Sequence, residues 1–327
     1  MKNKKLTLLF FLFHLCVTGF AQDVLLQTQS TMKQEFINPA FSSLKSYTSI
    51  NLMNRYQWLG QLSGAPVTYA AHVYIPMSET GLGVSFMAIN QAVGLRKKTS
   101  FSGSFSHNLR INRANFLSLG YSVGLQNVSF DTKRLQAYPD INLDGINLSD
   151  LDVGVSIGML FYDPTFFVGL SSNMLITKSM YSPGWMIQGF DLTAGYMYRI
   201  SNSVFFRPDM VLKYYPAKQF LNEFGENSQS PAAPVLDLGV NFLVADRLWF
   251  GTSHCLGQAQ TFSVDVIIKD AFKFGYIYEI GMGKGLNQFS SQGIRLVWSF
   301  ISKSELKRFN RTERHNLSSK MCTYLYR

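Results

Sequence analysis

Residues 151–161 read LDVGVSIGMLF, and this stretch decides the fold class. Its odd-numbered positions are all apolar, whereas Asp152, Gly154, Ser156 and Gly158 are polar or small. A side-chain period of two places the two sets on opposite faces of a β-strand. The run has the length of a tilted transmembrane strand, about ten residues, whereas sandwich strands have about five or six. The stretch therefore predicts a strand with one lipid-facing side and one polar side.

The same alternation recurs between residues 47 and 300, with no convincing helix between the segments. Segments 100–110 and 272–280 show it clearly, because aromatic and aliphatic residues recur at every second position. A sheet in a bilayer must close on itself, since its edges would otherwise expose unpaired backbone groups. The sequence predicts an all-β fold, a transmembrane antiparallel β-barrel of about fourteen strands.

The connections between these segments are of two lengths, which alternate along the chain. Outer-membrane barrels have short periplasmic turns and longer extracellular loops, so both termini are expected in the periplasm. The three longest outward loops, at residues 131–149, 177–189 and 216–234, are the expected partner contacts. The tight turns lie at residues 76–80, 112–114, 163–165, 201–203, 245–247 and 270, and the long loops at 131–149, 177–189, 216–234 and 281–291.

The amino terminus has the features of a secretory signal. Lys2, Lys4 and Lys5 precede an apolar run over residues 6–17, and small residues end at Ala21. These features predict a cleavable signal peptide and export to the outer membrane. The predicted organisation is a signal peptide over 1–21, a periplasmic segment or plug over 22–46, a barrel over 47–300 and a basic tail over 301–327.

The net charge of +10 is concentrated at the two ends of the chain, in the leader and the tail. The barrel region is nearly neutral, so no nucleic-acid partner is expected. The tail is either solvated or in contact with peptidoglycan, anionic lipid headgroups or a partner protein. After the leader only Cys255 and Cys322 remain, and no metal spacing, phosphate loop or dinucleotide fingerprint occurs, so no cofactor or metal is expected.

Two histidines are candidate catalytic residues, because some small barrels modify lipids. His107 and His254 fall on the lipid-facing side, and serines are abundant near His107. Because serines are abundant, a serine near a histidine carries little information. Both histidines are therefore interpreted as ordinary strand residues, and no catalytic residue is assigned. A lipid hydrolase or acyltransferase stays as an alternative, tested by loss of activity in His107→Ala or His254→Ala.

Charged residues of both signs fall at positions predicted to face the lumen. They would either line a pore and tune its selectivity or pair within a filled barrel, and the mixed signs favour pairing. These residues are Asp152, Asp191, Arg199, Asp237, Asp265, Lys273, Glu279 and Arg295.

The first third of the chain carries a series of short motifs: FINPAF from Phe36, RYQWLG from Arg55, GAPVTY from Gly64, GLGVSF from Gly81 and an Asn90 to Gly94 spacing. In this order behind a signal peptide, they resemble the PorP/SprF family of type IX secretion and gliding-motility membrane proteins of Bacteroidetes. The resemblance covers about residues 22 to 110. The motif residues are Asn38, Pro39, Ala40, Arg55, Gln57, Trp58, Gly64, Ala65, Pro66, Gly81 and Gly83.

Physical roles follow for several motif residues. Asn38 before Pro39 favours an extended or turn conformation that fixes how the chain enters the first strand. Arg55 and Trp58 would lie at the extracellular end of that strand, where Arg55 could pair or bind outside. Residues 64–66 would shape the first outer loop.

The resemblance implies a non-enzymatic outer-membrane component of a type IX secretion system. Its implied partners are outer-membrane lipid, a secreted surface adhesin or the carboxyl-terminal domain of that adhesin, and periplasmic type IX components. The implied role is secretion or surface anchoring of such a protein. The alternative from the barrel pattern alone is a porin-like or hydrophobic-substrate channel, which single-channel conductance would reveal.

Overall fold

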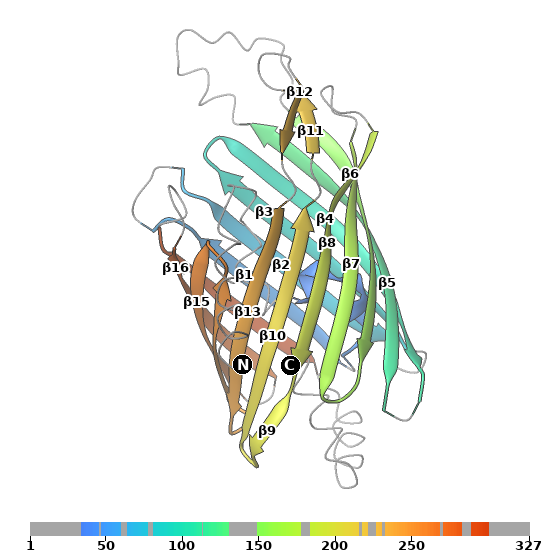
Figure 1. Cartoon of the computed structure of the whole chain (residues 1–327), viewed down its shortest axis with the longest axis vertical. Coiled ribbons are helices and arrows are strands. Elements are labelled where there is room, and N and C mark those ends of the chain that lie inside the picture. Colours follow the sequence, from blue (N-terminus) through green and yellow to red (C-terminus); the bar gives the residue numbers. More distant parts are fainter. Residues whose placement is uncertain are drawn as a thin grey trace, which may run out of the picture.

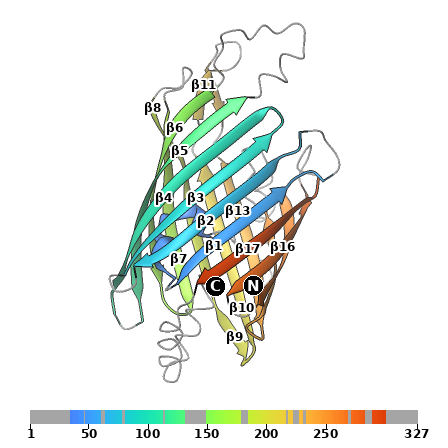
Figure 2. The same ribbon diagram turned by 180° about the vertical axis from the view of Figure 1, so that it is seen from behind.

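The protein is a closed β-barrel, shown from two sides in Figures 1 and 2. The computed structural model describes residues 34–45, 47–59, 64–77, 81–112, 114–130, 149–177, 184–215, 218–221, 227–230, 233–268, 271–282 and 289–300. Within these ranges every strand pairs antiparallel with its neighbours, and β1 pairs with β17, so the sheet has no free edge there. Fourteen strands form the closed circuit, as the sequence predicts, because β9 continues the line of β8 and the β11–β12 hairpin lies apart.

The strands of the barrel are β1 (Thr48–Tyr56), β2 (Val67–Met77), β3 (Leu82–Val93), β4 (Arg96–Arg110), β5 (Phe116–Phe130), β6 (Ser149–Tyr162), β7 (Phe166–Thr177), β8 (Gly184–Tyr196), β9 (Tyr198–Ser201), β10 (Val204–Tyr215), β13 (Ala233–Val244), β14 (Leu248–Cys255), β15 (Ala259–Ile268), β16 (Phe272–Gly281) and β17 (Ser291–Phe300).

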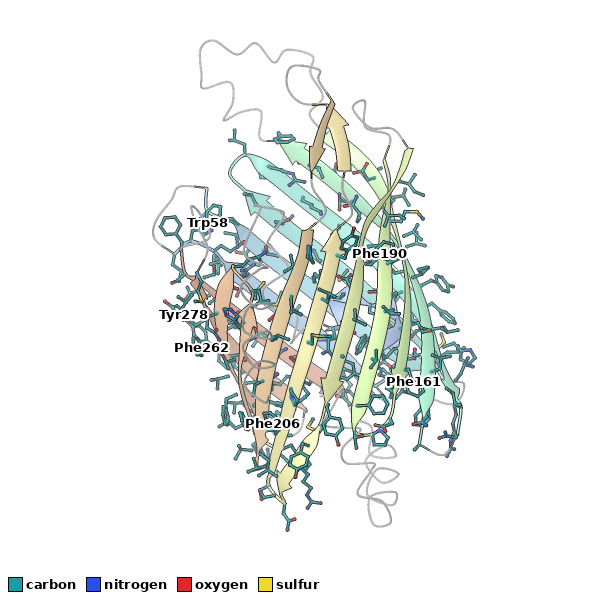
Figure 3. All side chains as sticks on the ribbon, in the orientation of Figure 1. Trp58, Phe161, Phe190, Phe206, Phe262 and Tyr278 are labelled. Atoms are coloured by element: carbon teal, nitrogen blue, oxygen red, sulfur yellow. The ribbon has the colours of Figure 1, made fainter. Side chains whose placement is uncertain are left out.

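The period of two sets the two faces of the wall. Along β6, Leu151 and Ile157 are 61% and 62% exposed, whereas Asp152 between them is 7% exposed. Figure 3 shows Phe161, Phe190, Phe262 and Tyr278 projecting from the outer surface. The apolar positions therefore form an outward belt, and the polar positions face the interior, which is the arrangement of a bilayer-spanning barrel.

The two ends of the barrel differ in their connections. We call the end with residues 163–165, 202–203 and 245–247 the short-turn end, and the opposite end the long-loop end. Within the described part of the chain, two connections at the long-loop end are also tight, at residues 94–95 and 256–258. The expected alternation of short and long connections is thus incomplete there.

One predicted loop is shorter than the sequence indicates. Residues 184–189, assigned to a loop over 177–189, belong to β8 and pair with β7. The register shifts between Asn173 and Met174, so Gln188 is an extra residue in β8. Such a bulge disturbs the period of two beside Gly189, which explains why the pattern resembled a loop. The connection over 216–234 likewise contains a hairpin of β11 (Lys218–Leu221) and β12 (Asn227–Ser230), seen above the barrel in Figure 1.

A proline interrupts one line of the sheet. Pro208 lies within β10, whose pairing with β9 ends at Phe206 and whose pairing with β8 begins at Asp209. Proline has no N–H to donate to a ladder, so the neighbouring strand is interrupted opposite Pro208 and divides into β8 and β9. The break falls at Met197, whose N–H donates instead to the Thr165 carbonyl at 2.6 Å.

Residues 34–45, which we call the inner segment, lie inside the barrel and are blue in Figure 1. They form α2 (Gln34–Ile37) and the 3-10 helix η3 (Pro39–Ser43), which lies against β2 to β6 near the short-turn end. Among the described residues no helix is long and apolar enough to cross a membrane. The predicted signal peptide (1–21), residues 22–33 and the tail (301–327) lie outside the described residues.

Candidate functional site

Asn38 fixes the inner segment to the barrel wall. Its side-chain nitrogen donates to the carbonyl oxygens of Met159 and Leu170, at 3.1 and 3.2 Å. Its side-chain oxygen accepts from the Ala40 N–H at 2.9 Å and caps η3. Met159 and Leu170 face each other on β6 and β7, so one buried amide bridges two strands and the inner segment.

Glycines in the wall make this close approach possible. A Cβ at Gly158 would overlap the Asn38 side chain, and one at Gly83 would overlap the Ser42 carbonyl. At Gly120 an added Cβ would lie 2.5 Å from the Ala40 nitrogen. The inner segment therefore packs directly on backbone, which only glycine permits.

Wall hydroxyl groups complete the attachment. Ser118 donates to the Ala40 carbonyl at 2.7 Å, and Ser85 shares a 2.8 Å hydrogen bond with Ser42. The Tyr74 hydroxyl donates to the Lys45 carbonyl at 2.5 Å. Further contacts join the segment to the wall at Ser43–Ser118, Ile37–Ser171 and Phe36–His72. These carbonyl and hydroxyl groups of the segment are thus matched by the wall, as buried polar groups require.

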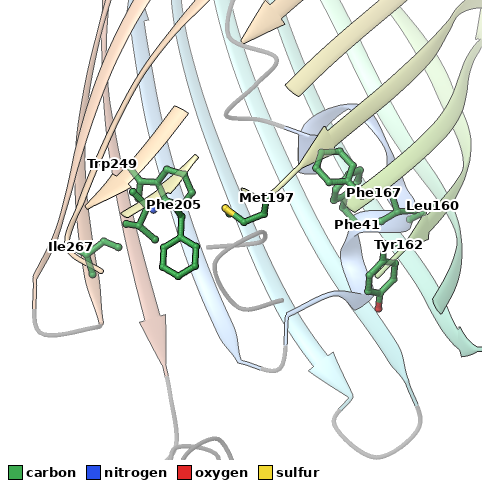
Figure 4. Close-up of a cluster of buried hydrophobic side chains, with 10 residues drawn as sticks. Phe41, Leu160, Tyr162, Phe167, Met197, Phe205, Trp249 and Ile267 are labelled. Carbon is green, nitrogen blue, oxygen red and sulfur yellow. The ribbon is translucent and has the colours of Figure 1, made fainter. Parts of the chain in front are cut away.

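An apolar layer continues from the inner segment along the interior wall at the short-turn end, on successive strands from β6 to β15. In Figure 4, Phe41 lies with Phe167, Leu160 and Tyr162 on one side, Trp249 and Ile267 lie opposite, and Met197 lies between them. Phe41 and Phe167 meet edge to face, with ring centroids 5.8 Å apart. The apolar layer consists of Ala40, Phe41, Leu160, Tyr162, Phe167, Met197, Phe205, Leu243, Trp249 and Ile267.

Arg55 faces the interior, and of its two expected roles, pairing or binding outside, the structure shows pairing. Its Nη2 donates to Glu279 Oε1 at 2.6 Å, and both side chains are buried. The strand between them, β17, has Gly293 opposite Arg55, which leaves the path clear of side chains. Arg55, a residue of the family motif on β1, is thereby paired with Glu279 on β16, which the sequence predicts to face the lumen.

Asp265 and Arg295 form a second interior ion pair. The residue between them in register is Gly275 on β16, and a Cβ there would overlap Asp265 Oδ1. This pair and the Arg55–Glu279 pair both span a neighbouring strand over a glycine. The Arg55–Glu279 pair joins strands on either side of the junction between β1 and β17, whereas the Asp265–Arg295 pair joins β15 to β17 on one side of it.

Arg207, Asp209 and Lys213 also face the interior, although they are not among the predicted lumen charges. They alternate on β10, and the signal was their shared parity in residues 204–215. Arg207 Nε lies 3.2 Å from Asp209 Oδ2, and its guanidinium lies 5.0 Å above the Trp249 ring. Asn241 donates to Asp209 at 2.9 Å.

The other predicted lumen charges are distributed around the wall. Asp191 accepts from Asn173 at 3.0 Å and lies opposite Lys213 in register. Asp152 and Asp237 are buried on β6 and β13, and Lys273 is half-buried on β16. Arg199 is not among these central groups, because its guanidinium donates to Ser201 and Asn202 at the tip of the β9–β10 turn.

The remaining motif residues form turns. Gly64 has φ of 85° and its carbonyl accepts from the Gly94 N–H at 2.8 Å, while the Pro66 carbonyl accepts from the Gln57 N–H at 3.0 Å. Gln57 is buried, Trp58 adopts φ of 52°, and Ala65 is half-buried. Gly81 has φ of 69° and its carbonyl accepts from the Asn108 N–H. These turns position the strands that hold the inner segment.

His107 and His254 are separate from the interior groups. His107 is exposed on the outer face of β4, and His254 Nδ1 lies 3.0 Å from Gln260 Oε1 on the neighbouring strand. No group of three or more His, Cys, Asp or Glu side chains able to hold a metal ion occurs within the described ranges.

Comparison with protein families gives a match over residues 19–299, to the family described as "Type IX secretion system membrane protein PorP/SprF". The chain belongs to the PorP/SprF family. Asn38, Arg55 and Gly83, whose contacts are given above, all lie within the matched residues. No curated protein matches the chain.

Solved structures share the barrel fold at low sequence identity. The toluene transporter TodX of Pseudomonas putida is 10% identical, with 87% of this chain and 94% of TodX covered and a TM-score of 0.51. Omp33 of Acinetobacter baumannii is 8% identical, with 79% and 100% covered and a TM-score of 0.45. TbuX of Ralstonia pickettii is 9% identical, with 87% and 95% covered and a TM-score of 0.46. This PorP/SprF protein therefore has an outer-membrane β-barrel fold and is a membrane protein of type IX secretion.

Proposed function

We propose that this PorP/SprF protein is a non-enzymatic scaffold with a closed lumen, which supports secretion or surface anchoring of a partner protein such as an adhesin. The attachment of the inner segment through Asn38 carries this proposal. A barrel that conducts solutes needs a continuous open lumen. Here the inner segment lies inside the barrel near the short-turn end, next to the apolar layer, and residues 34–45 are the described part of the proposed plug.

The long-loop end is the proposed partner surface. We place it outside the cell and the short-turn end in the periplasm, following the usual asymmetry of such barrels. The β11–β12 hairpin supplies an ordered element beyond the wall, within the connection between β10 and β13. An adhesin carboxyl-terminal domain bound there would be held at the cell surface, while periplasmic type IX components would contact the opposite end.

Affinity purification of the full chain from native outer membranes in mild detergent tests this function. Mass spectrometry of the bound proteins should identify a large secreted protein together with type IX components. Removal of residues 218–230 should abolish recovery of the secreted protein. The matched control is Ala245→Gly in the β13–β14 turn, which alters only the short-turn end. Recovery of the barrel alone from cells that secrete normally would contradict the proposal.

The channel alternative receives its support from the fold of TodX, which is described as a toluene transporter. The inner segment opposes this alternative, because it lies inside the barrel near the end through which a solute would leave. Transport of a small hydrocarbon by vesicles that contain the purified protein would favour a channel over a scaffold.

A further inference from the structure

The outer wall has a hollow where the lipid-facing belt is interrupted by two small side chains. Ala71 and Ala88 lie opposite each other on β2 and β3, between Leu52 on β1 and Phe101 on β4. Both flanking residues are large and exposed. The hollow has a volume of about 400 Å³, and these strands lie side by side in Figure 2.

The row of residues directly above the two alanines, toward the long-loop end, is polar. Asn54, Tyr69, Asn90 and Thr99 follow one another across β1 to β4 and line the upper edge of the hollow. Asn90 donates to Thr99 at 2.8 Å. Polar and aromatic residues of this kind mark the interface between hydrocarbon and headgroups. The hollow therefore extends from the apolar belt up to the membrane interface.

A basic residue lies just beyond this polar row. Lys97 is exposed on the outward face of β4, two residues from Thr99, which corresponds to roughly 7 Å along a strand. Lysine is a common binding partner for phosphate, and a basic group at the membrane surface attracts anionic lipid. The order along the wall is thus an apolar hollow, a hydrogen-bonding rim and a positive charge.

We propose that the hollow binds one acyl chain of a phosphorylated membrane lipid, with the phosphate of that lipid held at Lys97. The volume is that of a pocket for a single small ligand, about 300–1,000 Å³. The charge at the rim selects an anionic headgroup. This site is independent of the lumen and of the proposed scaffold function.

Native mass spectrometry of the full chain tests the site. The protein is reconstituted in nanodiscs of phosphatidylcholine with phosphatidylglycerol as the probe and is then released from them. Wild type should retain one phosphatidylglycerol molecule. Ala71→Leu with Ala88→Leu fills the hollow and should remove it. Ala194→Leu is the matched control, because Ala194 is a half-buried, outward-facing alanine of β8, between Val168 and Met210.

Lys97→Gln tests the headgroup. It should lower the preference for phosphatidylglycerol over phosphatidylcholine about fivefold. Arg247→Gln at the short-turn end is the control and should leave the preference unchanged. The single Ala88→Leu variant replaces the double variant if heat-modifiable migration shows that the double variant does not fold.

Equal lipid retention by wild type and the filled variants would overturn the proposal, as would an unchanged headgroup preference in Lys97→Gln. A dimer in the wild-type spectrum that is lost in the filled variants would also overturn it, and would assign the hollow to a second copy of the chain.

Discussion

Arg55 on β1 and Glu279 on β16 are joined by a 2.6 Å hydrogen-bonded ion pair that crosses β17. The two residues are 224 positions apart in the chain. They lie beside the junction where the first and last strands meet, which is the point at which closure of the barrel depends on long-range pairing. Both side chains are buried, so neither charge is compensated by bulk water.

Glu279→Gln leaves the Arg55 charge buried without its counter-ion. We expect a loss of about 3–5 kcal/mol in the free energy of unfolding, because a broken buried pair leaves an uncompensated charge. Urea unfolding in lipid vesicles measures this loss. The double variant Arg55→Gln with Glu279→Gln should be more stable than either single variant. Single variants as stable as wild type would show that the pair does not hold the junction.

Gly275→Ala should disrupt the Asp265–Arg295 pair, because the added methyl group overlaps the Asp265 carboxylate. We expect a lower midpoint in urea, with the barrel fold retained. Gly154→Ala is the matched control: Gly154 also faces the interior, and its added Cβ would lie no closer than 4.0 Å to its neighbours. Equal midpoints for the two variants would contradict the assigned role of Gly275.

Gly158→Ala should displace the inner segment, because the new Cβ overlaps the Asn38 side chain. Ser42→Cys, in a Cys322→Ser background, reports this displacement through labelling by a water-soluble maleimide. Ser42 is buried, so the cysteine introduced at position 42 should react slowly when no glycine is replaced. With Gly158→Ala it should react at least about tenfold faster. Gly154→Ala, on the same face of β6, should leave the slow rate unchanged. Fast labelling in every background would mean that the segment is not held.

Arg207→Gln should remove the positive charge from above the Trp249 ring. We expect a changed tryptophan emission spectrum and a stability loss of ~1–2 kcal/mol, from the lost cation–π contact and the lost pairing with Asp209. Fluorescence during urea titration measures both. Arg199→Gln is the control, because the Arg199 guanidinium donates to Ser201 and Asn202 at the β9–β10 turn and not to a group beside Trp249. An unchanged spectrum in Arg207→Gln would contradict the stacking.

The sequence was sufficient for the fold because the period of two extends through nearly every strand. Leu151 and Asp152 are assigned to opposite faces by parity alone, and the family follows from motifs that begin at Phe36. Parity fails where the ladder is irregular. The extra residue Gln188 breaks the alternation near the start of β8, and Pro208, which is atypical of a strand interior, lies between Arg207 and Asp209.

The contacts of the candidate site could not be read from the sequence. Parity gives the face of a side chain, whereas a partner depends on the register of strands that are distant in the chain. Asn38 bonds to residues 121 and 132 positions away, and the sequence leaves open whether Arg55 pairs or binds outside, whereas the structure pairs it with Glu279. Gly83 belongs to a motif and Gly158 to none, and the role of both appears only once the inner segment lies against them.

Single-channel recording of the purified full chain in planar bilayers tests the closed lumen most directly. The account predicts that wild type is silent, and that Asn38→Ala combined with Gly158→Ala conducts because the inner segment is released from the wall. Steady conductance by wild type, unchanged in the double variant, would contradict the closed lumen and establish an open pore.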